Sequence, residues 1–160
     1  MDTQRLLDLV KATAAAFPDP ASPDRTKWLL IWCCDLVGEL GEFIESGELV
    51  EAGDCLWGLG AVSLASGVAI PFVRPADTYI RTMTILPESL KLLDHLKKVA
   101  RDGIDNRPLD VELITKTFSK VLMFLGQYVD LDDAIAAVEI KLMKRYPQGF
   151  SPEASVNRTI

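Results

Sequence analysis

The feature that most constrains the fold is a stretch of 19 residues, 55–73, that contains no charged side chain. The stretch is nearly long enough to span a bilayer, which takes about 20 apolar residues in a helix. It also contains three glycines, two serines and Pro71, and this proline should end a helix near residue 69. A helix of roughly four turns that is apolar on all sides must be surrounded by other helices. We therefore expect a central core helix and no membrane span.

The rest of the chain repeats apolar residues with helical spacing, and signals for strands are sparse. Ser22 with Pro23 is predicted to start one helix as N-cap and first helical residue, Pro87 to break or kink another, and Asp130 to cap the last. Together these signals predict an all-α protein of one domain, 1–160, with about five or six helices around a four-helix core. The predicted helices cover residues 3–16, 23–46, 48–69, 76–101, 110–128 and 131–146.

Two segments, 49–59 and 114–125, have similar apolar patterns when Asp54 is aligned with Lys120. An internal duplication, with degenerate repeats at about 26–73 and 84–146, is one explanation. The other is that any two core helices look alike at this level. The acids of the first segment have no counterpart in the second, so only the first copy is expected to carry a site.

The composition excludes some classes of function. The formal net charge is −6, with no basic stripe of the kind that nucleic-acid binding needs, and the cluster at 97–101 has the pattern of a solvated helix face. The protein has three cysteines, an odd number with no metal-type spacing, and we expect buried, reduced thiols and a cytoplasmic location.

Four acids form the candidate site. Glu39 and Glu42 are three residues apart, as are Glu51 and Asp54, so each pair lies on one face of its helix. A tight turn at Ser46-Gly47 should bring the pairs together, and there is no lysine or arginine between residues 28 and 73. Carboxylate oxygens suit Mg²⁺, with Mn²⁺ as a substitute, and Mg²⁺ commonly shares its ligands with phosphates. The alternative is that these acids form an ordinary solvated helix face.

The sequences GELGE at 38–42 and EAGDCLW at 51–57 resemble the ExxE…ExxD signature of MazG-like nucleotide pyrophosphohydrolases. The sequence KLMKRYPQGFS at 141–151 resembles the closing motif of the same family. The resemblance covers about 26–70 and 109–158. It implies an all-α NTP pyrophosphatase fold, usually oligomeric, and we expect a homodimer. It also implies Mg²⁺-dependent hydrolysis of an NTP or dNTP to the monophosphate and pyrophosphate.

In this resemblance Glu39, Glu42, Glu51 and Asp54 match the metal ligands, and Lys141 and Arg145 match basic positions that hold phosphates. Glu39 is our candidate for the residue that activates water, while Trp32 and Trp57 either stack on the base or pack in the core. Only eight residues separate Glu42 from Glu51, fewer than is usual in the family. This short spacer favours the alternative function, a non-catalytic nucleotide-binding or helical interaction protein that retains the fold.

Overall fold

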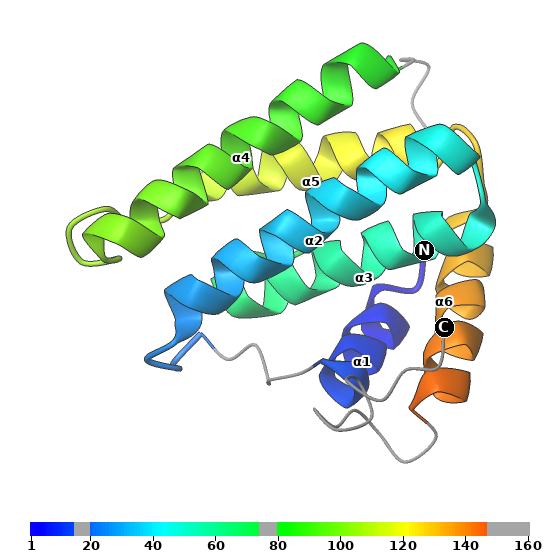
Figure 1. Ribbon diagram of the computed structural model, residues 1–160, viewed down its shortest axis with the longest axis horizontal. Helices are drawn as coiled ribbons and strands as arrows, with labels where there is room; N and C mark the ends of the chain where they lie inside the picture. Colours follow the sequence, from blue (N-terminus) through cyan, green and yellow to red (C-terminus); the bar gives the residue numbers. More distant parts are fainter. Residues whose placement is uncertain (15–19, 74–79, 147–160) are drawn as a thin grey trace.

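The computed structural model describes residues 1–14, 20–73 and 80–146, and these residues contain helices and no strand (Figure 1). The predicted all-α class is therefore confirmed. The helices are α1 Thr3–Thr13, α2 Arg25–Ser46, α3 Leu49–Ser66, α4 Thr82–Asp102, α5 Val111–Leu125 and α6 Leu131–Arg145.

Helix α3 lies at the centre of the bundle. It packs against α2, α6, α1 and α5, while α2 also packs on α4 and α4 on α5. The four helices α2 to α5 thus form the predicted core, and α6 lies across the N-terminal part of α3 (Figure 1). Thirteen of the 18 residues of α3 are buried, as expected for a helix that is apolar all round. No helix among the described residues is long and apolar enough to cross a membrane.

Glycines of α3 allow neighbouring helices to approach it closely. A Cβ atom added at Gly58 would lie 3.2 Å from Cα of Leu36 in α2. At Gly53 an added Cβ would lie 2.4 Å from the carbonyl oxygen of Ala134 and 2.8 Å from Cβ of Val138, both in α6. Contacts shorter than 3.0 Å require a shift of the backbone, so Gly53 sets how closely α6 approaches α3.

Several predicted helix ends differ from the structure, and α5 ends at Leu125, three residues before its predicted end. Helix α2 begins at Arg25, because residues 22–25 form a turn in which the hydroxyl of Ser22 accepts from the backbone N–H of Asp24 at 3.3 Å. Helix α3 ends at Ser66, three residues before the predicted end. Gly67 takes a left-handed conformation with φ 73° and donates its N–H to the carbonyl of Ser63, so the glycine stops the helix before Pro71 can.

Other helix signals had mixed outcomes. Helix α4 is unbroken through Pro87, which lies in its second turn and removes a single backbone donor. The predicted Asp130 cap is confirmed, since its carboxylate accepts from the N–H groups of Asp132 and Asp133. Helix α1 ends at Thr13 and α4 begins at Thr82, inside the predicted ranges 3–16 and 76–101. The predicted tail from residue 147 lies outside the described residues. All three cysteines are free, and Cys34 is exposed, contrary to the expectation that all three are buried.

Candidate metal centre

Three carboxylates from α2 and α3 meet near the turn that joins these helices. The turn is short because Gly47 ends α2 in a left-handed conformation with φ 68°, and α3 begins two residues later. Each of Glu39, Glu51 and Asp54 offers a carboxylate oxygen, and these three oxygens lie within 4.8 Å of one another. The structure therefore brings together three of the four acids that the sequence singled out.

Glu42 is the fourth acid, and it lies outside this group. Its side chain is exposed, one turn closer to the helix end than Glu39. Glu42 is still near enough for its charge to raise the pKa of Glu39. It belongs to the rim of the site, where it adds negative potential.

Glu39 and Glu51 are in an environment that disfavours their negative charge. Burial raises the pKa of Glu39 to about 7, and the neighbouring charges of Asp54 and Glu42 add to this shift. Burial also raises the pKa of Glu51, with a counteracting effect from Lys141. Such a group is stabilised either by taking up a proton or by binding a cation.

Lys141 of α6 supplies a positive charge at this site. Its ammonium group donates to a carboxylate oxygen of Asp54 and forms an ion pair with it. The close contact of α6 with Gly53 explains the position, because Val138 lies over Gly53 and Lys141 is one turn further along α6. The predicted basic residue thus contacts one of the predicted metal ligands.

Arg145 is placed differently from Lys141. It is the last residue of α6, its side chain is exposed, and it makes no recorded ion pair with a described residue. The structure does not bring it to the three carboxylates. The rest of the closing motif, from residue 147, lies outside the described residues.

The two candidate base-stacking tryptophans pack against each other. The ring centroids of Trp32 and Trp57 are 5.1 Å apart in an edge arrangement, and Trp28 stacks on the other side of Trp32. The indole N–H of Trp57 donates to the hydroxyl of Thr13 at 2.9 Å. The indole nitrogen of Trp32 is buried and has no hydrogen-bond partner in the part of the chain that the structure describes. Both rings have a packing role, and base stacking stays a prediction.

No protein-family model, curated protein or solved structure matches this chain. The chemistry of the site therefore rests on its own geometry. Three part-exposed carboxylates form a hard, all-oxygen donor set that fits a divalent cation such as Mg²⁺ or Mn²⁺. Three protein ligands leave coordination positions for water and for a phosphate oxygen.

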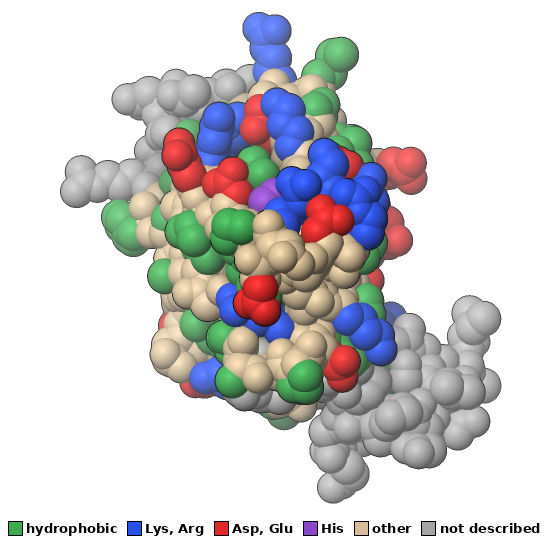
Figure 2. Space-filling model, turned by 90° about the vertical axis from the view of Figure 1, so that its left-hand side faces the viewer, with side chains coloured by type: hydrophobic (Ala, Val, Ile, Leu, Met, Phe, Trp, Pro, Cys, Tyr) green, Lys and Arg blue, Asp and Glu red, His purple; other side chains and the backbone are tan. Residues whose placement is uncertain are grey.

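The single histidine, His95, links two helices of the bundle. Nε2 of His95 in α4 accepts from the backbone N–H of Asp110, the N-cap of α5, at 3.0 Å. Figure 2 shows Lys and Arg side chains around this histidine with Asp and Glu among them. Asp94 pairs with Lys97 and Lys98, and Asp102 pairs with Arg101 and Arg107. This face is largely charge-compensated, which fits the predicted solvated helix face.

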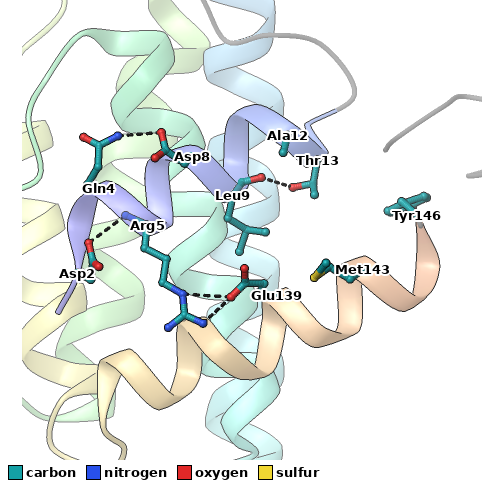
Figure 3. Close-up of a pocket in the computed structure, with 10 residues that line it drawn as sticks. All are labelled: Asp2, Gln4, Arg5, Asp8, Leu9, Ala12, Thr13, Glu139, Met143 and Tyr146. Carbon is teal, nitrogen blue, oxygen red and sulfur yellow. Dashed lines mark hydrogen bonds and ion pairs between the residues drawn. The ribbon is translucent and has the colours of Figure 1, made fainter. Parts of the chain in front are cut away.

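A hollow of about 670 Å³ lies between α1 and α6, and no feature of the sequence predicts it. Figure 3 shows its lining, in which the guanidinium of Arg5 donates twice to Glu139, at 3.1 and 2.5 Å. Met143 and Tyr146 continue the same face of α6. The hollow arises from two amphipathic helices far apart in the sequence, so residue spacing cannot reveal it.

Proposed function

We propose that this protein is a magnesium-dependent nucleoside triphosphate pyrophosphohydrolase that converts an NTP or dNTP to the monophosphate and pyrophosphate. The observation that carries the proposal is the convergence of Glu39, Glu51 and Asp54 beside the ammonium group of Lys141. The order of acidic and basic motifs, similar to that of MazG-like enzymes, supports the same reaction. A homodimer acting in the cytoplasm, with Mn²⁺ able to replace Mg²⁺, is part of the proposal.

The protein's own residues have separate tasks in this reaction. Glu39, Glu51 and Asp54 would hold the metal, which polarises the phosphate and makes its bound water more acidic. Glu39 would also accept the proton of the water that attacks the α-phosphorus, through a carboxylate oxygen that does not bind the metal. The bond from this phosphorus to the bridging oxygen breaks, and Lys141 neutralises charge on the leaving pyrophosphate.

A second candidate is a non-catalytic nucleotide-binding protein with the same fold. One observation favours it: the charge of Asp54 is already compensated by Lys141, and Glu42 lies outside the group. In that case nucleotide binding persists while no pyrophosphate is released.

The test is to incubate the pure protein with NTPs and dNTPs in the presence of Mg²⁺ and to measure pyrophosphate. We expect release from at least one nucleotide, lost in Glu39→Gln and retained in Glu88→Gln. Glu88 is a matched control because it is a part-buried glutamate of α4 that pairs with Lys120, away from the three carboxylates. Nucleotide binding without any cleavage would establish the second candidate instead.

A further inference from the structure

The ammonium group of Lys141 forms an ion pair with one of the carboxylates that a bound cation would use. It contacts an oxygen of Asp54, and both side chains are largely shielded, with 23% and 12% of their surface exposed. Asp54 is also one of the three residues whose oxygens converge. A lysine and a divalent cation therefore compete for the same carboxylate.

The backbone that carries Lys141 is held from two sides. On one side Val138 and the carbonyl of Ala134 press against Gly53. On another face of α6, Glu139 pairs with Arg5 of α1 across the hollow shown in Figure 3. With the helix held, the flexible four-carbon stem of lysine is the part that can relocate the charge.

We infer that Lys141 is an exchangeable internal counter-ion: it occupies Asp54 when the site lacks a divalent cation and leaves Asp54 when the cation binds. This inference rests on the proposed function, because the displaced ammonium group then faces the anionic phosphates of the substrate. Since the cation must displace Lys141, the free cation binds weakly, and a polyphosphate that attracts the ammonium group strengthens cation binding.

The first test measures Mn²⁺ binding to the full chain by electron paramagnetic resonance, without nucleotide. We expect Lys141→Met to bind Mn²⁺ about tenfold more tightly than the unmodified protein, because the competing charge is gone. The matched control is Lys144→Met, the same change on an exposed residue one turn further along α6. It should leave the affinity within about twofold, since exposed charges are well screened.

The outcomes separate the two proposals. If the unmodified protein binds Mn²⁺ and Lys141→Met binds it equally or more weakly, Lys141 is a fixed structural partner and the exchange is wrong. If neither protein binds Mn²⁺, the metal site fails, and the proposed function fails with it.

A second measurement needs no substitution. The rate of acetylation of Lys141 is followed by mass spectrometry with and without saturating Mn²⁺, and Lys144 serves as the internal reference. We expect Mn²⁺ to raise the reactivity of Lys141 several-fold relative to Lys144, because the ammonium group is released from Asp54. An unchanged ratio at saturation contradicts the exchange.

Discussion

The two helical hairpins of the core, α2–α3 and α4–α5, differ in how fully their part-buried charges are paired. Between α2 and α3, three carboxylates converge and Lys141 pairs with one of them. Between α4 and α5, the carboxylate of Glu88 is paired with Lys120 at 3.1 Å and with Lys91 at 3.3 Å. The first site has an excess of negative charge, whereas the second has its charge satisfied. The excess negative charge that the proposed cation would compensate therefore lies in the first hairpin.

The pKa shifts show the same contrast. Burial and neighbouring acids raise the pKa of Glu39 to about 7, while hydrogen bonding to Lys120 lowers the pKa of Glu88. In the alignment that suggests a duplication, Lys120 stands where the first segment has Asp54. A lysine in place of an acid accounts for the satisfied charge of the second hairpin, whether or not the hairpins share an origin.

The largest expected effect is a difference in catalytic activity between a variant of the first hairpin and a variant of the second. Asp54→Asn removes a ligand charge, and we expect it to reduce kcat/KM for the cleaved nucleotide about 10³-fold. Glu88→Gln should change it less than about twofold, since Glu88 makes its ion pairs with lysines of α4 and α5 only. Steady-state pyrophosphate release measures both. Equal losses in the two variants contradict a site confined to the first hairpin.

A smaller effect concerns the contact that brings Lys141 to the first hairpin. Gly53→Ala places a methyl group against Ala134 and Val138 of α6, and we expect a loss of about 2–3 kcal/mol in the free energy of unfolding. Gly41→Ala is the matched control, because its added Cβ would meet no described residue within 4 Å beyond its own stretch of helix, and it should stabilise α2 by about 0.5–1 kcal/mol. Urea denaturation tests the pair. A neutral Gly53→Ala shows that α6 does not need this close approach.

The pH dependence of stability should have opposite sign in the two hairpins. A carboxyl whose pKa is raised on folding stabilises the fold below its unfolded pKa, 4.5 for Glu39, and this contribution is lost as the pH rises to about 7. Glu88, whose pKa is lowered, stabilises the fold above 4.5, and its contribution is lost on acidification.

Over roughly pH 3 to 8 in metal-free buffer, Glu39→Gln should therefore gain stability relative to the unmodified protein as the pH rises from 4.5 to 8. Glu88→Gln should lose stability relative to it as the pH rises to about 5, and its difference should then stay level. Each change is on the order of 1 kcal/mol because both carboxylates are partly solvated. Denaturant titrations across this range give the two slopes. Slopes of the same sign contradict the contrast between the hairpins.

The smallest effect concerns an unpaired hydroxyl in the second hairpin. Ser89 of α4 is 1% exposed, and its hydroxyl oxygen has no hydrogen-bond partner among the described residues. Ser89→Ala removes a buried unsatisfied group, so we expect it to be neutral or stabilising by up to about 1 kcal/mol and to leave nucleotide cleavage unchanged. Thermal denaturation measures the shift. A clear destabilisation indicates that the hydroxyl has a partner.

The sequence predicted the fold well because its signals are local. The charge-free segment of α3, the stop at Gly47 and the cap at Asp130 each act within one helix or turn. The errors at the start of α2 and the end of α3 arose where two local signals compete. At the end of α3, Gly67 acts before Pro71 is reached.

The candidate site could be predicted only in part. The spacing of Glu39, Glu51 and Asp54 across a short turn was sufficient to place them together, but helical spacing could not show that Glu42 lies outside the group. The pairing of Lys141 with Asp54 spans 87 residues and depends on how α6 crosses α3 at Gly53. Such a crossing is a property of packing and cannot be derived from residue spacing.

The central claim is that the first hairpin, and not the second, holds a divalent cation. The most direct measurement is an anomalous scattering map from crystals of the full chain soaked in Mn²⁺. We expect a peak bounded by Glu39, Glu51 and Asp54, with the ammonium group of Lys141 moved off Asp54, and no peak beside Glu88. A map without a peak at the three carboxylates, from crystals in saturating Mn²⁺, contradicts the claim.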